Sequence, residues 1–194
     1  QSKLPNTTAV GDEFEKVVKL YLKNDPKYQK LLKNVWLLDE VPSKVKTYLN
    51  LPYKDEGIDL VCETNEGEFW SVQSKYKTNE NASLTHKELA TFTSLSFVLC
   101  KNISHGLVCT TTNSYRKLFE NSDKVSFITG DTWRHLDFQY FDILYGRKQK
   151  VILDPFKPYS YQKPAISSAK KHFNNNSRGI LIMPCGSGKS LTAY

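Results

Sequence analysis

Three polar residues on two adjacent strand-like segments have the types that a metal-dependent hydrolytic site uses. Asp59 lies in the first segment, and Gln73 and Lys75 alternate in the second. Carboxylate and amide oxygens are hard ligands that suit Mg²⁺, and a bound Mg²⁺ can activate water and offset the charge on a phosphate. A lysine beside them can position the water or stabilise developing charge. We therefore treat all three as candidate catalytic residues, with Asp59 and Gln73 as candidate metal ligands.

The length of the intervening turn predicts how these side chains are aligned. If residues 65–67 form a three-residue turn with Gly67 in the left-handed conformation, Asp59 lies opposite Gln73 on the next strand. Side chains alternate along a strand, so Gln73 and Lys75 share a face and lie about 7 Å apart. We expect Asp59 to lie on that same face. A loop one residue longer or shorter would break this alignment.

The first helix can supply a further carboxylate. Its apolar residues recur at helical spacing, and they are Phe14, Val17, Val18, Tyr21 and Leu22. Glu15 lies at the margin of this apolar stripe and can point toward the sheet, where a carboxylate carries a hydration cost unless it meets a cation. We expect Glu15 to be a metal ligand beside Asp59. Glu13 flanks the other edge of the stripe and remains the alternative.

A second cluster, near the C-terminus, has the residue types and order of a phosphate-binding loop. It follows an apolar run at residues 179–182, where we expect a strand, and it comprises Gly186, Ser187, Gly188, Lys189 and Ser190. The glycines allow backbone amides to curl around phosphates, Lys189 can reach the terminal phosphates, and the Ser190 hydroxyl can hold Mg²⁺. Met183 stands where the first glycine of this motif usually occurs.

The composition indicates a folded chain with a weak basic bias. The 194 residues are 39% hydrophobic and 24% charged, which excludes disordered and fibrous classes. Residues 1–150 hold 21 Lys and Arg against 19 Asp and Glu, so charge alone is weak evidence for a nucleic-acid partner. No apolar run reaches the ~18 residues that span a bilayer, and residues 1–10 lack the apolar stretch of a signal peptide. We expect a cytoplasmic protein without membrane contact.

The cysteines do not have the spacing of a zinc site or of a disulfide framework. They are Cys62, Cys100, Cys109 and Cys185, with no CxxC motif. We expect reduced and mostly buried thiols.

The order of predicted elements indicates a mixed α/β domain. We expect strands at residues 35–38, 58–63, 68–75, 107–110 and 125–129. A first helix ends near Asn24, and Thr85 and Glu88 have the spacing of a capping box that opens a second helix. Further helical segments are expected at residues 115–119 and after Gly130-Asp131. Residues 39–56 are a polar stretch rich in Pro and Lys, to which no helix or strand is assigned.

The first set of residues resembles the Mrr-like branch of the PD-(D/E)xK nucleases. The resemblance rests on Phe14-Glu15 in the first helix, on the Asp59…Gln73-x-Lys75 arrangement, and on the order helix, three strands, helix, strand. It implies a restriction-endonuclease-like core, with a mixed central sheet flanked by helices, and a Mg²⁺-dependent endonuclease that acts on double-stranded DNA. Ile58 replaces the usual proline, and Gln73 replaces the usual acidic residue. The Mrr-like branch tolerates both changes.

The C-terminal cluster resembles the start of a superfamily 2 helicase or translocase. The relaxed position at Met183 is typical of that superfamily, and Gln162 resembles its adenine-reading glutamine. The resemblance implies that Gln162 and residues 186–190 bind ATP with Mg²⁺, in the N-terminal piece of a RecA-like P-loop domain. A nuclease followed by such a motor resembles the ATP-dependent, single-polypeptide restriction enzymes related to Type I.

These resemblances predict two domains. Residues 1–150 are expected to form the nuclease domain, and residues 151–194 a linker and the truncated start of a helicase/ATPase domain. We expect the remainder of a larger motor polypeptide to be missing, and no ATP turnover by this piece alone, since it lacks the acidic motif and arginines of phosphoryl transfer. The alternative is a catalytically inactive DNA-binding or docking module at the N-terminus of a helicase. The presence of Asp59, Gln73 and Lys75 favours the nuclease.

Overall fold

The computed structural model describes residues 7–52, 57–79, 81–115, 122–149 and 158–183. The chain forms two compact units, Gln1–Val151 and Ile152–Tyr194. The described elements of the first unit are α1 (Thr7–Asn24), α2 (Pro26–Leu31), β1 (Leu32–Leu37), η1 (Leu38–Glu40), α3 (Ser43–Leu49), β2 (Leu60–Thr64), β3 (Phe69–Lys75), α4 (His86–Ser94), η2 (Leu95–Leu99), β4 (Ile103–Thr110), β5 (Val125–Ile128), α5 (Gly130–Arg134) and α6 (Gln139–Leu144). The described part of the second unit contains α7 (Gln162–Phe173).

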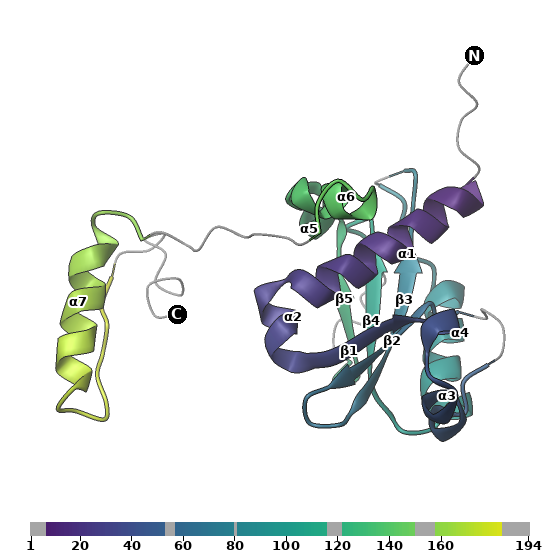
Figure 1. The fold of residues 1–194 in the computed structure, drawn as a ribbon, viewed down its shortest axis with the longest axis horizontal. Helices are drawn as coiled ribbons and strands as arrows, with labels where there is room; N and C mark the ends of the chain where they lie inside the picture. Colours follow the sequence, from purple (N-terminus) through teal and green to yellow (C-terminus); the bar gives the residue numbers. More distant parts are fainter. Residues whose placement is uncertain (1–6, 53–56, 80, 116–121, 150–157, 184–194) are drawn as a thin grey trace, which may run out of the picture. The chain divides into compact units, whose positions relative to one another are not determined.

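One five-stranded sheet organises the first unit, and α1 runs along one of its faces (Figure 1). The strand order is β1-β2-β3-β4-β5, and the pairs β1–β2 and β2–β3 are antiparallel. The pairs β3–β4 and β4–β5 are parallel. Parallel pairs need a crossover connection, and α4 lies in the one between β3 and β4. The expected mixed sheet flanked by helices is therefore confirmed.

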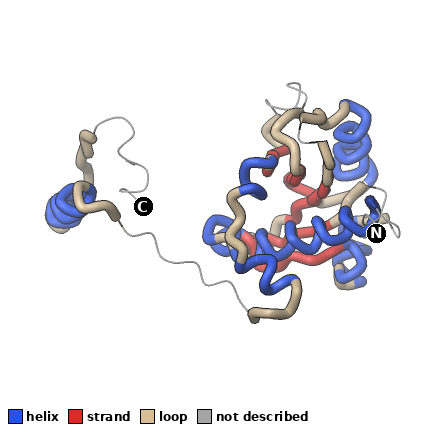
Figure 2. The backbone as a smooth tube through the Cα atoms, turned by 90° about the horizontal axis from the view of Figure 1, so that it is seen from above, coloured by secondary structure: helices blue, strands red, loops and turns tan. Residues whose placement is uncertain are grey.

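Two apolar cores, one on each face of the sheet, hold helices on both sides of the strands (Figure 2). On one face, Phe14, Val18 and Leu22 of α1 pack with Leu60 and Cys62 of β2. On the other face, residues of α3, α4 and the strands pack together, including Leu49, Leu89, Phe92, Val61 and Val108. Burial of these side chains, at roughly 25 cal/mol per Å² of apolar surface, fixes the helices that must position the candidate site.

Several local expectations are confirmed. Gly67 has φ of 85°, which a glycine adopts without the strain of a Cβ, and the N–H of Thr64 donates to the carbonyl of Glu68 at 2.8 Å. The β2–β3 register runs as expected from Glu63↔Phe69 to Leu60↔Val72. The capping box also forms, since Thr85 accepts from the N–H of Glu88 and the Glu88 carboxylate accepts from the N–H of Thr85.

Other local expectations are wrong. No helix is expected in the polar stretch at residues 39–56, but α3 lies within it and buries Leu49 completely. This helix has seven residues, too few to show clear periodicity in the sequence. Residues 179–182 form no strand, and Ile180 and Ile182 are 92% and 89% exposed. The described part of the second unit offers them no strand partner, and an unpaired segment has no ladder of hydrogen bonds.

Some expectations reach past the described residues. The helix expected at residues 115–119 lies outside them from residue 116 onward. Cys62, Cys100 and Cys109 are free and buried, whereas Cys185 lies outside the described part. Among the described helices, none has the length and apolar character needed to cross a membrane.

Candidate active site

A β-bulge shapes the backbone at Asp59. Leu60 pairs with Val72 across β2 and β3, and the N–H of Asp59 also donates to the carbonyl of Val72, at 2.9 Å. Two residues thus oppose one, which defines a bulge, and bulges re-aim side chains at the ends of strands. Leu60 packs in the core under α1, whereas Ile58 packs with Val61 in the core on the other face. The bulge adds a residue to the ladder and turns Asp59 to the side of Leu60.

A backbone N–H holds the Asp59 side chain. It is 6% exposed, and its Oδ2 accepts a hydrogen bond from the N–H of Ser74 in β3. The carbonyl of Asp59 accepts from the N–H of Leu38 at 2.9 Å, which ties it to the end of β1. Burial, followed by the charges of Cys62 and Asp59, raises the pKa of the Cys109 thiol well above its usual range. Cys109 belongs to the core under α1, so this interaction agrees with the direction of the Asp59 side chain.

Asp59 and Glu15 line one pocket of about 390 Å³. Its lining consists of Asp12, Glu15, Lys16, Leu37, Leu38, Asp39, Lys46 and Asp59. Four carboxylate residues and two lysines give the lining a net negative charge, which attracts cations. Glu13 does not line the pocket, and its carboxylate pairs with the Lys16 ammonium at 2.7 Å. The structure therefore brings Glu15, and not Glu13, to the pocket of Asp59.

Gln73 is anchored through its amide nitrogen. Its Nε2 donates to the carbonyl of Gly57 at 2.9 Å, and the side chain is 2% exposed. The other amide atom, Oε1, is buried without a hydrogen-bond partner. Leaving a buried acceptor unpaired costs about 1–3 kcal/mol, and such exceptions in native proteins often mark catalytic groups or the place of an ion.

Lys75 is the last residue of β3. Its side chain is partly buried, and within the described part of the chain its ammonium forms no ion pair. Lys77, two residues later, pairs with Glu88 at 2.6 Å, and its N–H donates to Oγ1 of Thr111. Lys75 is therefore available to a substrate, whereas Lys77 is held against α4.

The expectation that Asp59, Gln73 and Lys75 share one face is wrong at Asp59. On β3, Ser71 faces the α4 side, where its hydroxyl donates to Ser96 at 2.8 Å, and Gln73 and Lys75 alternate with it. Asp59 instead faces the α1 side because of the bulge. Lys75 is not among the described residues that line the pocket of Asp59. All three lie at the same end of the sheet, where β2 begins and β3 ends.

The oxygen donors fit a hard divalent cation. Mg²⁺ in proteins is typically bound by one or two carboxylates and keeps several waters. Asp59 and Glu15 offer two carboxylates, and Gln73 offers an amide oxygen that has no protein partner. No group of three or more His, Cys, Asp and Glu side chains within the described ranges could hold a metal. Neutral oxygens and waters would therefore have to complete the coordination.

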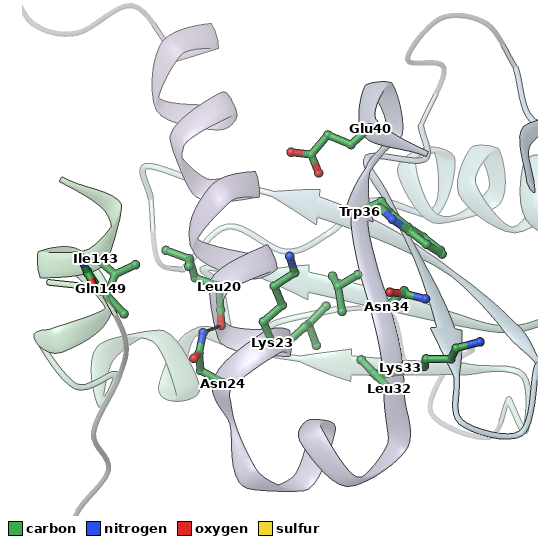
Figure 3. Close-up of a pocket in the computed structure, with 12 residues that line it drawn as sticks. Leu20, Lys23, Asn24, Leu32, Lys33, Asn34, Trp36, Glu40, Ile143 and Gln149 are labelled. Carbon is green, nitrogen blue, oxygen red and sulfur yellow. Dashed lines mark hydrogen bonds between the residues drawn. The ribbon is translucent and has the colours of Figure 1, made fainter. Parts of the chain in front are cut away.

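A second pocket, of about 530 Å³, lies between α1 and the edge strand β1 (Figure 3). Lys23, Lys33 and Glu40 contribute to its lining. The Lys33 ammonium pairs with Glu63 at 3.0 Å, and the Glu40 carboxylate pairs with Lys19. None of the candidate site residues lines this pocket, so it plays no part in the proposed chemistry.

Gln162 is the candidate ATP-binding residue that lies in the described part of the second unit. Gln162 is 1% exposed, and its Oε1 accepts from the N–H of Tyr159 at 2.9 Å. The rings of Tyr159 and Tyr161 stack beside it, with centroids 5.6 Å apart. The expected phosphate-binding residues 186–190 lie outside the described part of the chain.

Two residues that orient the candidate site were missed in the sequence. Gly57 has φ of 122° and precedes β2 by three residues, so a glycine next to a predicted strand was the available signal. Ser74 acts through its backbone N–H, a group that every residue except proline carries. No pattern in the sequence could single it out.

Two family models match the chain. A restriction endonuclease family, Mrr_cat_2, matches residues 23–142, which is more than half of the chain. A family described as the res subunit of Type III restriction enzymes matches residues 155–194. The expected combination of an Mrr-like nuclease domain and the start of a helicase domain is therefore confirmed.

Two solved structures are similar to the chain. One is described as the ATP-dependent Type ISP restriction-modification enzyme LlaBIII bound to DNA, with 29% identity and a TM-score of 0.66. The match covers 97% of this chain and 12% of that one, so the chain spans a small part of that enzyme's length. The other, a protein of unknown function named AF1548, is 13% identical over 81% of this chain and 78% of its own, with a TM-score of 0.39. No curated protein matches the chain.

Proposed function

This chain belongs to the restriction endonuclease family, and on that premise we propose that its first unit is a Mg²⁺-dependent endodeoxyribonuclease. The observation that carries the proposal is the convergence of Asp59 and Glu15 on one negatively charged pocket. Two carboxylates turned to one cavity repel each other, and a divalent cation between them relieves that repulsion. The bulge at Asp59 supports the same assignment, because bulges are over-represented next to active sites.

The roles of the residues follow from their surroundings. Asp59 and Glu15 would hold the metal, whereas Gln73 does not line their pocket and would become its neutral ligand only if the end of the sheet rearranged when DNA binds. A Mg²⁺ ion held there would supply an activated water and would offset charge on the scissile phosphate. Asp59 is kept in place by the N–H of Ser74, so its orientation is set before metal or substrate arrives. Lys75 would stabilise the charge that develops on the phosphate, since its ammonium forms no ion pair with the described residues.

The second unit adds a proposed link to a motor. Its family match supports the assignment of residues 186–190, with Gln162, to the binding of ATP with Mg²⁺. The similar Type ISP enzyme is described as ATP-dependent and bound to DNA, which supports double-stranded DNA as the partner of this chain. We infer a larger polypeptide in which the motor drives DNA past the nuclease site. The chain would then be the N-terminal part of an ATP-dependent restriction enzyme.

One observation favours the alternative function, a catalytically inactive DNA-binding or docking module. Lys75 does not line the pocket that Asp59 and Glu15 share, and it faces the other side of the sheet. If the sheet end keeps this arrangement when DNA binds, Lys75 cannot reach the phosphate held at the metal. Cleavage by the protein, and its loss on Lys75→Ala, would separate the two functions.

The direct test is cleavage of supercoiled plasmid DNA by the full-length polypeptide with ATP. We expect nicked or linear products with MgCl₂ and none with EDTA in excess. We expect Asp59→Ala to abolish cleavage while leaving DNA binding intact, because Asp59 binds metal and the DNA backbone is bound by cations. Cleavage that persists in EDTA, or that is unchanged in Asp59→Ala, would refute the nuclease.

A further inference from the structure

One lysine in the pocket of Asp59 is not paired with a carboxylate. Lys16 and Lys46 both line this pocket, and the Lys16 ammonium pairs with Glu13 at 2.7 Å. Within the described part of the chain the Lys46 ammonium forms no ion pair, and it donates to the backbone carbonyl of Asp39 at 3.3 Å. An ammonium carries three N–H donors. Lys46 can therefore keep its contact with Asp39 and also bind an anion.

Helix α3 anchors the backbone of Lys46. Leu49, three residues later, is fully buried in the core. The carbonyl of Lys46 accepts from the N–H groups of Asn50 and Leu51, which closes the end of the helix. The carbonyl of Leu49 accepts from the N–H of Lys101 at 2.8 Å, which ties α3 to the segment before β4. The side chain of Lys46 therefore starts from a fixed position, as a binding site requires.

The short segment η1 connects Lys46 to Asp59. The N–H of Leu38 donates to the carbonyl of Asp59 at 2.9 Å. The next residue, Asp39, is the one whose carbonyl accepts from Lys46. Lys44, on the same helix, is exposed and does not line the pocket, whereas Lys46 is partly buried and does. Position in the fold, and not charge alone, therefore distinguishes Lys46 from its neighbour.

The charge of the pocket explains why such a lysine matters. Its lining has four carboxylate residues and two lysines. A divalent cation would balance this negative surplus but would leave no net positive charge to attract a phosphate. A charged N–H donor at the pocket supplies that attraction locally, and lysine is a common phosphate binder. Lys75 faces the other side of the sheet and Lys16 is paired, which leaves Lys46 for this contact.

We propose that Lys46 is a substrate-binding residue of the nuclease site, whose ammonium contacts a phosphate of DNA at the pocket of Asp59. This inference rests on the proposed function and deepens it, since it names the group that recognises the DNA backbone on this side of the sheet. Lys46 acts in addition to Lys75, because the two lysines lie on opposite sides of the sheet.

The first test measures how DNA binding depends on salt. Lys46→Met removes the ammonium but keeps an apolar stem, and Lys44→Met is the matched control on the same helix. Both substitutions are placed in the Asp59→Asn background, which removes a negative charge from the pocket so that a short DNA duplex can approach in EDTA. The affinity for this duplex is measured over a series of KCl concentrations.

The slope of log affinity against log salt counts the phosphate contacts. Each contact to a DNA duplex contributes about 0.9 to the size of that slope. We expect Lys46→Met to reduce the slope by about 0.9 and Lys44→Met to leave it unchanged. An unchanged slope for Lys46→Met, or equal decreases for the two variants, would overturn the proposal.

Metal affinity separates a phosphate contact from a structural role. Lys46→Met, in the protein that keeps Asp59, removes a like charge from the pocket, so its affinity for Mn²⁺ by calorimetry without DNA should equal or exceed that of the wild type. Cleavage of plasmid DNA by the full-length polypeptide with MgCl₂ and ATP should fall by about 100-fold, and Lys46→Arg, which keeps the charge, should recover part of the loss. A Lys46→Met protein that loses Mn²⁺ affinity would show a structural role and overturn the proposal.

The outcomes also separate this inference from the proposed function. Wild-type protein that neither binds Mn²⁺ nor cleaves DNA would refute the proposed function. Cleavage that is lost in Asp59→Ala but retained at the wild-type rate in Lys46→Met would refute the role of Lys46 alone.

Discussion

The N–H of Ser74 donates a hydrogen bond to Oδ2 of Asp59, and so links the end of β3 to the residue that precedes β2. This contact exists because a bulge opposite Val72 turns Asp59 away from the regular alternation of the strand. The carboxylate is therefore held by a main-chain N–H at the wall of a pocket that Glu15 also lines. A ligand held in this way needs no rearrangement when a cation arrives, which is the advantage of a preorganised site.

The pocket distinguishes Glu15 from its neighbour Glu13. Glu15 lines it with Asp59, whereas Glu13 is paired with Lys16 and lies outside. We predict that Glu15→Gln raises the Mg²⁺ concentration needed for half-maximal DNA cleavage by about 10-fold or more, because one charged ligand is lost. Glu13→Gln is the matched control and should leave that concentration unchanged. A larger effect from Glu13→Gln than from Glu15→Gln would contradict the assignment of Glu15 as the metal ligand on α1.

Lys75 and Lys77 form a second matched pair. Lys75→Ala should abolish cleavage while leaving metal affinity and Tm near wild type, since its ammonium has no ion pair among the described residues. Lys77→Ala breaks the pair with Glu88 and should cost about 1 kcal/mol of stability, with cleavage retained. Plasmid cleavage, Mn²⁺ calorimetry and thermal unfolding of both variants give the three readouts. Normal cleavage by Lys75→Ala would favour the docking module over the nuclease.

Glu88 predicts a pH dependence of folding. Burial would raise its pKa, but hydrogen bonds from Lys77 and Thr85 outweigh that effect and lower the pKa from 4.5 to about 2. The pKa is lower in the folded state, so this stabilisation is present above about pH 4.5 and is lost as the pH falls toward 2. Urea unfolding of the wild type should lose stability more steeply across that window than unfolding of Glu88→Gln. Parallel losses in the two proteins would show that Glu88 is not the titrating group.

The sequence carries much of the information that places β2 and β3. Gly67 sets a short turn, and the alternating apolar residues allow one register that buries them, so the pairing of Leu60 with Val72 could be predicted. The Thr85–Glu88 capping box could be predicted too, because both partners belong to one helical turn. Both features depend on contacts between residues that are close in sequence.

The direction of Asp59 could not be predicted, because it depends on a bulge. A bulge changes which face a side chain takes without any change in residue type, and it is stabilised by contacts with Val72, Ser74 and Leu38 that the fold brings together. The choice between Glu13 and Glu15 depended in the same way on which edge of α1 meets the end of the sheet. Both depend on tertiary contacts, so neither could be predicted from the local pattern of apolar and polar residues.

The measurement that tests the nuclease most directly is DNA cleavage by Asp59→Asn. Asparagine keeps an oxygen that can accept from the N–H of Ser74, so the bulge and the fold are retained while the negative charge is removed. With MgCl₂, ATP and supercoiled plasmid, we predict that cleavage falls by about 100-fold or more, with Tm and DNA binding near wild type. Cleavage at the wild-type rate would contradict a metal-dependent site at Asp59.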